Sequence, residues 1–170
     1  TDDAGAIELA EAASLAGFAL FAGPKDDVLL RYVLAASEFG LSRIMRATGD
    51  NPFVSVPLAD MLAQRNRENQ ADYAGFIGMP VGMGVELIRV EALKRACEES
   101  SDPYDHKHVC PYLYRNPTVF RVDQPQCPVL WHAPDKRLTV DTEADYHFAQ
   151  AIVSELGSDP DDEAIMRYLN

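Results

Sequence analysis

Apolar residues at helical spacing form the most regular pattern in this chain. The first stretch follows Thr1–Asp3, which offers helix N-caps, and it stops before Gly17. A second stretch follows the acidic pair Asp26 and Asp27 and stops at Gly40. The pattern predicts a short C-terminal helix and five longer ones, over Ile7–Leu15, Val28–Phe39, Val56–Asn69, Glu91–Ser100 and Thr142–Leu156.

Short apolar or alternating runs lie between these helices and indicate strands. The predicted strands are Phe18–Phe21, Ser42–Ala47, Asp72–Phe76, Val85–Val90, Phe120–Asp123 and Arg137–Val140. Strands that alternate with helices predict an α/β fold, a mainly parallel sheet with helices on both faces. Residues 102–112 are interpreted as a loop. Without an internal repeat or a linker, residues 1–170 are expected to form a single domain.

The charge balance restricts the partners that the surface can attract. The net charge is −12, from 27 acidic and 15 basic residues, so the surface repels polyphosphate backbones and nucleic-acid binding is not expected. A small anionic substrate would need a local basic pocket or a bridging cation.

The three cysteines, Cys97, Cys110 and Cys127, form no CxxC pair, and they predict neither a disulfide framework nor a zinc site. No apolar run approaches the ~20 residues of a membrane-spanning helix, and no signal segment opens the sequence. We therefore expect a cytoplasmic protein without membrane partners.

Two aspartates directly follow predicted strands. Asp50 lies in the turn Arg46–Pro52, and Asp141 follows Val140. Ligands collect at the carboxyl ends of parallel strands, and Mg²⁺ is commonly held by one or two carboxylates plus substrate phosphates. The alternatives are local: Asp50 as a turn residue, and Asp141 as a neighbour of a capping box formed by Thr142 and Asp145.

Histidines and glycines give weaker signals. His106 and His108 share a face only in an extended loop, so surface or hydrogen-bonded roles are expected rather than a metal site. Gly78, Gly82 and Gly84 would allow a backbone to approach a ligand closely, yet they form no P-loop.

Five stretches, in order, carry a resemblance to a known family over nearly the full chain. They are D-D-V-L-L-R-Y (26–32), R-A-T-G-D-N-P (46–52), V-E-L-I-R-V-E-A-L (85–93), D-P-Y-D-H-K-H-V (102–109) and R-L-T-V-D-T-E-A-D (137–145). The sequence resembles spore-coat polysaccharide cytidylyltransferase-like proteins, relatives of the acylneuraminate cytidylyltransferases. The resemblance implies a nucleotide-diphosphosugar-transferase fold and transfer of CMP from CTP to a sugar or sugar acid for cell-surface polysaccharide biosynthesis.

The resemblance also implies roles for single residues. Asp50 and Asp141 would bind Mg²⁺, with Gly49 beside Asp50 in the nucleotide site. Arg46 would contact phosphate during catalysis, or form a structural ion pair instead. Glu86 and His108 would contact the sugar.

Two departures from the family pattern limit this assignment. Gly84 stands where many relatives have an acidic residue, which puts the sugar contact in doubt. Relatives typically begin with a strand and a phosphate-binding loop that this sequence lacks, so we expect an N-terminally incomplete domain without a complete active site. The exposed strand edge would favour a homodimer. The alternative function is therefore a non-catalytic, truncated relative that acts as a binding or assembly module.

Overall fold

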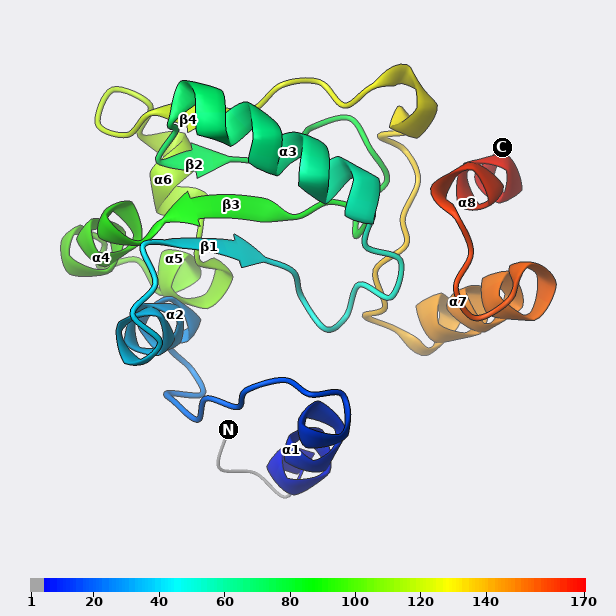
Figure 1. Ribbon diagram of the computed structural model, residues 1–170, viewed down its shortest axis with the longest axis horizontal. Coiled ribbons are helices and arrows are strands. Elements are labelled where there is room, and N and C mark those ends of the chain that lie inside the picture. The colour runs from blue at the N-terminus through cyan, green and yellow to red at the C-terminus, as the bar shows by residue number, and fades with distance from the viewer. Residues whose placement is uncertain (1–4) are drawn as a thin grey trace. The chain divides into compact units, whose positions relative to one another are not determined.

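The computed structural model describes residues 5–170 and forms a mixed α/β structure (Figure 1). The predicted caps at Thr1–Asp3 lie outside the described residues. The chain divides into two compact units, one of Thr1–Ile44 with Arg89–Phe120 and the other of Met45–Ile88 with Arg121–Asn170. We call them the first and second unit and describe each by itself.

The first unit is helical. Its helices are α1 (Gly5–Leu15), α2 (Val28–Glu38), α4 (Val90–Glu99), α5 (Pro103–His108) and α6 (Pro111–Arg115). Asp27 caps α2 by accepting a 2.9 Å hydrogen bond from the Leu30 N–H, as the sequence predicts. Helix α2 packs against α4 and α5. Leu29 of α2 and Leu93 of α4 are fully buried.

Four short strands form one open sheet in the order β1-β3-β2-β4. They are β1 (Arg43–Arg46), β2 (Tyr73–Ala74), β3 (Glu86–Arg89) and β4 (Val122–Asp123). Strand β2 pairs antiparallel with β3, placing Tyr73 opposite Ile88, and parallel with β4. The sheet is therefore mixed, because it contains both an antiparallel and a parallel pairing.

In the second unit, helix α3 (Val56–Asn69) packs onto the sheet through small and branched side chains of α3, of β2 and β3, and of the residues just before these strands. These are Ala59, Leu62, Ala71, Ala74, Val85 and Leu87. A second apolar cluster joins Trp131 of the 3₁₀ helix η1 (Val129–Trp131) to α7 (Glu143–Leu156) and α8 (Asp162–Leu169). Ile152 of α7 and Ile165 of α8 are buried in it.

Three sequence predictions are wrong in detail. Phe18–Phe21 forms no strand, since Phe18 is 73% exposed and the run has no partner strand. Residues 102–112 hold α5 and most of α6 instead of a loop, because Asp102 caps a helix that starts at Pro103. Arg137–Val140 is extended but makes only an isolated parallel bridge, between Arg137 and Val81.

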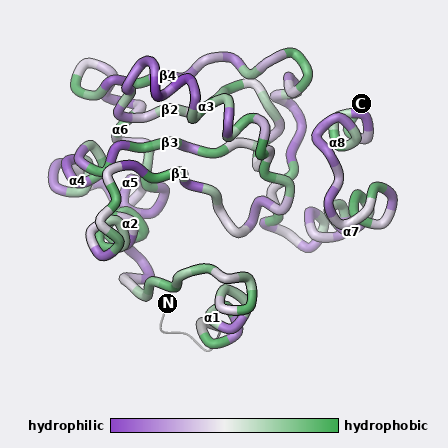
Figure 2. Tube along the Cα trace, in the orientation of Figure 1, coloured by the Kyte–Doolittle hydropathy of each residue, from purple (hydrophilic) through white to green (hydrophobic). Residues whose placement is uncertain are grey.

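Hydrophobic and hydrophilic residues are interspersed along α2 and α7 (Figure 2). Within residues 5–170, the helices are too short or too polar to cross a lipid bilayer.

Candidate functional site

The turn after β1 presents Asp50 at the surface of the second unit. The turn is closed by the Asn51 N–H, which donates to the Thr48 carbonyl at 3.1 Å, and by the Asn51 side-chain amide, which donates to Thr48 Oγ1 at 2.7 Å. Asp50 itself is exposed. The turn chemistry expected for these residues is therefore present, and Asn51 supplies it.

The segment that ends at Asp141 lies beside this turn. The Val140 N–H donates to the Asp50 carbonyl at 2.8 Å, and the Leu138 N–H donates to the Val81 carbonyl at 2.7 Å. The backbones of the two candidate aspartates thus meet at one hydrogen bond, one residue before Asp141. The structure brings together the two residues that strand-end reasoning selected.

Glycine at position 82 allows the loop that contains it to lie close to both segments, at Asn51 and at Thr139. A side chain at this position would start 2.7 Å from the Thr139 nitrogen and 3.0 Å from Asn51 Oδ1, and the Gly82 φ of +95° is one that other residues rarely adopt. The glycine-containing loop therefore approaches this chain's own backbone closely.

Arg137 and Asp145 surround Asp141. The Arg137 guanidinium donates to the Asp141 carboxylate, and its Nε lies 3.5 Å from Asp145. Asp145 accepts hydrogen bonds from the N–H groups of Asp141 and Thr142 at 3.0 and 2.9 Å. The Asp141 N–H and the Thr142 hydroxyl are the leading causes that lower the pKa of Asp145 to about 2. The predicted capping box is present, and it also orients the backbone that carries Asp141.

Arg46 and Glu86 form the second group of predicted site residues in this unit. Arg46 Nη1 donates to Glu86 Oε2 at 2.5 Å, and the Tyr73 hydroxyl donates to Glu86 Oε1 at 3.0 Å. The side chains of Arg46 and Glu86 are 19% and 23% exposed. Both Glu86 oxygens therefore have a protein partner, and the arginine forms the ion pair that was the structural alternative.

A Mg²⁺ ion prefers oxygen ligands such as carboxylates. Among the described residues, no three His, Cys, Asp or Glu side chains group closely enough to hold a metal on their own. Asp50 and Asp141 supply two exposed carboxylates on adjoining segments. That set fits Mg²⁺ bound jointly with nucleotide phosphates, which is how this ion is usually held.

His106 and His108 both lie in α5, where residues two apart point in different directions, and the two side chains differ in exposure. His106 faces inward: its Nε2 donates to the Ser100 carbonyl at 2.9 Å and its Nδ1 lies 2.9 Å from Asp27 Oδ1. His108 is exposed and packs against Tyr104, with the ring centres 4.2 Å apart and the ring planes tilted by 38°. Of the two, only His108 presents its ring to a ligand in solution.

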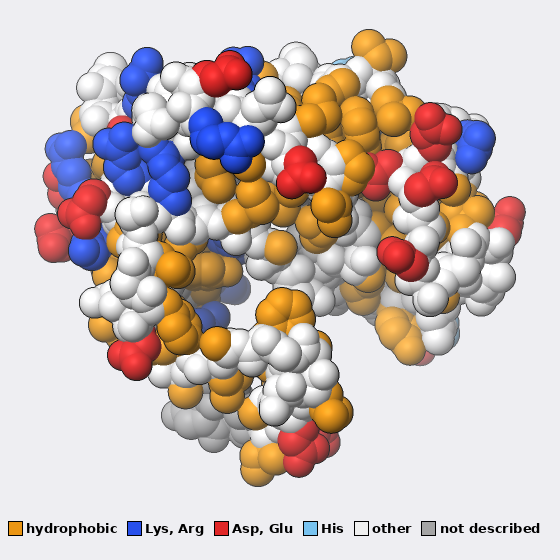
Figure 3. Space-filling view, in the orientation of Figure 1, with side chains coloured by type: hydrophobic (Ala, Val, Ile, Leu, Met, Phe, Trp, Pro, Cys, Tyr) orange, Lys and Arg blue, Asp and Glu red, His pale blue; other side chains and the backbone are white. Residues whose placement is uncertain are grey.

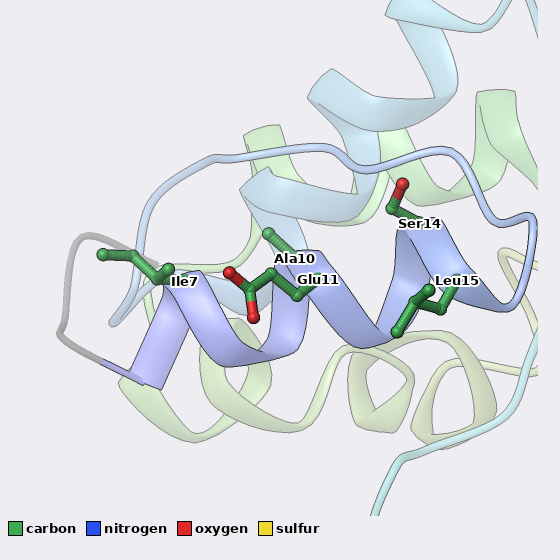
Figure 4. Close-up of a pocket in the computed structure, with 5 residues that line it drawn as sticks. All are labelled: Ile7, Ala10, Glu11, Ser14 and Leu15. Atoms are coloured by element: carbon green, nitrogen blue, oxygen red, sulfur yellow. The ribbon is translucent and has the colours of Figure 1, made fainter.

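Two cavities of the described residues lie away from these side chains. One, of about 660 Å³, is lined by residues of α1, including Ile7, Glu11 and Leu15 (Figure 4). Another, of about 320 Å³, lies along α3 and includes Arg65 and Phe76. Arg65 donates two hydrogen bonds to the Asp123 carboxylate, so its positive charge is already paired. Neither cavity offers an unpaired cation for a triphosphate among these lining residues.

Hydrophobic side chains are exposed around η1, where Val129 is 92% exposed (Figure 3). This surface carries none of the predicted site residues.

Sequence reasoning did not select Tyr73 or Arg137. Arg137 precedes Asp141 by four residues within one family stretch, which is a usable signal for an ion pair. Tyr73 gave no such signal, because its contact with Glu86 depends on the register of β2 against β3.

The mixed four-stranded sheet and the helices of the chain define an α/β fold. Residues 1–167 match the model of a cytidylyltransferase family, and the chain belongs to that family.

Similar proteins include the spore coat polysaccharide biosynthesis protein SpsF of Bacillus subtilis, 33% identical over 147 residues, which cover 85% of this chain and 61% of that protein. The uncharacterized protein MJ1063 of Methanocaldococcus jannaschii is 33% identical over 130 residues, which cover 76% of this chain and 54% of that protein. The chain thus spans a little more than half the length of these two relatives.

A solved structure of a cytidylyltransferase from Leptospira borgpetersenii has the same fold, with a TM-score of 0.91 at 23% identity. The match covers 99% of this chain and 73% of that one.

Proposed function

We propose that this chain contributes to a Mg²⁺-dependent cytidylyltransferase that transfers CMP from CTP to a sugar or sugar acid. The observation that carries the proposal is the hydrogen bond between the Asp50 carbonyl and the Val140 N–H, which sets two candidate metal ligands on adjoining segments. Membership of the cytidylyltransferase family supports CTP as the nucleotide. The similarity to a spore coat polysaccharide biosynthesis protein supports a sugar acceptor.

In the proposed reaction, an acceptor oxygen bonds to the α-phosphorus of CTP as the bond from that phosphorus to the β-phosphate oxygen breaks. Pyrophosphate leaves, and the acceptor proton passes to solvent or to a base. Mg²⁺, when bound, neutralises the charge that builds on the transferred group and the leaving pyrophosphate.

The residues of this chain supply position and charge. Asp50 and Asp141 would hold the metal with the phosphates. Gly49 lies beside Asp50, and the space that a Cβ of residue 49 would enter is open, with nothing within 4 Å. Asp145 and Arg137 orient the Asp141 segment through their contacts with it. The value of this preorganisation is that the ligands do not have to reorganise during the reaction.

Glu86 and Arg46 take a supporting part. Their ion pair, closed by Tyr73, fixes the end of β1 from which the Asp50 turn starts. Contact of Glu86 with the sugar and of Arg46 with phosphate stays a prediction, because each would have to be made alongside this pair.

The direct test measures pyrophosphate release by the full product of the encoding gene, with CTP, Mg²⁺ and a panel of sugars and sugar acids. UTP and ATP in place of CTP test the nucleobase. We expect release with CTP and at least one acceptor, and a loss of more than ~100-fold for Asp50→Asn with Asp141→Asn. Asp60→Asn removes the same charge from the exposed face of α3 and serves as the matched control. No release with any acceptor, or full activity of the double variant, would refute the proposal.

A further inference from the structure

Arg137 lies on a segment of the second unit whose backbone is held on both sides of it. The Val81 N–H donates to the Lys136 carbonyl at 3.0 Å, and the Leu138 N–H donates to the Val81 carbonyl at 2.7 Å. Leu138 is 2% exposed, whereas the Arg137 side chain is 46% exposed. Successive side chains of an extended segment point to opposite sides, so burial of Leu138 directs Arg137 to the surface.

The Arg137 guanidinium contacts two carboxylates that differ in how firmly they are held. Its Nη2 donates to Asp141 Oδ2, and its Nε lies 3.5 Å from Asp145 Oδ1. The other oxygen of Asp145 accepts hydrogen bonds from the N–H groups of Asp141 and Thr142 and from the Thr142 hydroxyl. The Asp141 side chain is 56% exposed and that of Asp145 is 21% exposed. Asp145 is therefore the fixed partner of Arg137, and Asp141 is the partner that a ligand can reach.

Arg137 and a metal ion would compete for Asp141. Under the proposed function, Asp141 holds Mg²⁺ jointly with Asp50 and the nucleotide phosphates. A guanidinium on the same carboxylate neutralises its charge and repels a second cation, so it weakens binding of the metal. A nucleotide that arrives with the metal carries phosphate oxygens, and the planar fork of a guanidinium matches these as well as it matches a carboxylate.

Two other arginines of this unit are paired with carboxylates that the proposed metal does not use. Arg46 pairs with Glu86, and Arg65 donates two hydrogen bonds to Asp123. Binding of Mg²⁺ would leave both pairs as they are, whereas it would take from Arg137 one of its two carboxylates. On a chain of net charge −12, a bound triphosphate needs a local cation, and Arg137 lies beside a candidate metal ligand.

We propose that Arg137 is a phosphate-binding residue that exchanges partners: it pairs with Asp141 until Mg²⁺ binds that carboxylate, and it then donates to a phosphate oxygen of CTP while Asp145 holds its Nε side. This inference rests on the proposed transferase function. It deepens that function by giving Arg137 two opposite effects. The site binds free Mg²⁺ weakly and the metal–nucleotide complex tightly.

Arg137→Gln should change the two affinities in opposite directions. Loss of the guanidinium releases Asp141, so Mn²⁺, which takes the same oxygen ligands as Mg²⁺, should bind to the full gene product roughly two- to fivefold more tightly without nucleotide. The phosphate contact is lost, so CTP with Mg²⁺ should bind roughly ten- to a hundredfold more weakly. The EPR signal of free Mn²⁺ measures the first affinity, and calorimetric titration measures the second.

Three further variants show whether the effect passes through Asp141. Lys136→Gln removes the same charge from the neighbouring residue and should leave both affinities near those of the wild type. Arg137→Gln combined with Asp141→Asn should lose the gain in Mn²⁺ binding, because that gain comes from the released carboxylate. Arg137→Lys keeps the charge but not the fork, so Mn²⁺ should bind as in the wild type and CTP with Mg²⁺ more weakly. An equal gain in Mn²⁺ binding in Lys136→Gln would overturn the proposal.

The remaining outcomes distinguish the exchange of partners from the proposed function. Suppose that the wild type binds CTP with Mg²⁺, but that in Arg137→Gln both affinities fall together or stay unchanged. The exchange of partners is then overturned alone. Tighter Mn²⁺ binding with unchanged binding of CTP and Mg²⁺ also overturns it, because no phosphate contact is then made. Wild-type protein that binds no CTP with Mg²⁺ refutes the proposed function, and the exchange of partners falls with it.

Discussion

The carbonyl of Asp50 accepts a 2.8 Å hydrogen bond from the N–H of Val140, the residue before Asp141. Two segments that lie about ninety residues apart in sequence are joined there, each ending in an exposed aspartate. The Arg137 guanidinium pairs with the Asp141 carboxylate, and under the proposed function Mg²⁺ with its nucleotide would bind beside this pair.

Gly82→Ala should disrupt that junction. The new Cβ would lie 2.7 Å from the Thr139 nitrogen in a backbone of positive φ, so we expect a loss of about 1–3 kcal/mol in the free energy of unfolding. Gly157 has the same φ of +95° with nothing within 4 Å, so Gly157→Ala isolates the cost of conformation alone. Urea unfolding of both variants gives the comparison, and equal losses would show that the close approach at Gly82 is unimportant.

Asp162 ties the C-terminal helix to the start of α3. One of its carboxylate oxygens accepts from Trp131 Nε1 at 2.7 Å and from the hydroxyl of Ser55, which is fully buried. Asp162→Ala leaves both donors without this acceptor, and we expect a loss of about 1–3 kcal/mol in urea unfolding. Glu163→Gln alters the exposed next residue and should change stability little. A small effect of Asp162→Ala would contradict the assigned contacts.

A double-mutant cycle separates the two roles of Arg46. If the arginine mainly pairs with Glu86, the single variants Arg46→Met and Glu86→Gln should couple by about 1–3 kcal/mol in the free energy of unfolding. Binding of CTP measured on the same variants reports the other role. Additive stability effects together with weakened CTP binding in Arg46→Met alone would favour the phosphate contact.

Stability should depend on pH through His106. The hydrogen bond to the Ser100 carbonyl, and then Asp27, raise the pKa of His106 above its usual value of 6.5. The protonated imidazole is therefore favoured in the folded state, so its stabilisation is complete below about pH 6.5 and is lost as pH rises through the raised pKa.

Asp27→Asn keeps a good N-cap on α2 but removes the charge beside His106, so this variant should lower the His106 pKa and flatten the pH dependence. NMR titration of the ring and urea unfolding between pH 5.5 and 8 measure both quantities. Asp26→Asn is the control, and an unchanged His106 pKa in Asp27→Asn would contradict the assignment.

Local signals predicted the elements well where the chain itself supplies them. Ser55 caps a helix with Pro57 in its first turn, and α3 begins and ends at the predicted residues. Asp102 and Pro103 give a comparable start signal for α5, but the polar, histidine-rich stretch that follows them favoured a loop. The run Phe18–Phe21 misled because hydrophobicity alone does not provide a partner strand.

Some residues of the candidate site could also be predicted from local sequence signals, and others could not. The ends of predicted strands pointed to Asp50 and Asp141, and the structure joins their backbones. The Tyr73 contact with Glu86 depends on the register of β2 against β3, which periodicity does not encode.

Calorimetric titration of CTP into the full gene product, with and without Mg²⁺, tests the shared carboxylate site most directly. We predict micromolar binding that requires Mg²⁺ in the wild type, is lost in Asp50→Asn and in Asp141→Asn, and is retained in Asp60→Asn. Binding of CTP that is equally tight without Mg²⁺, or that survives loss of both aspartates, would contradict the account.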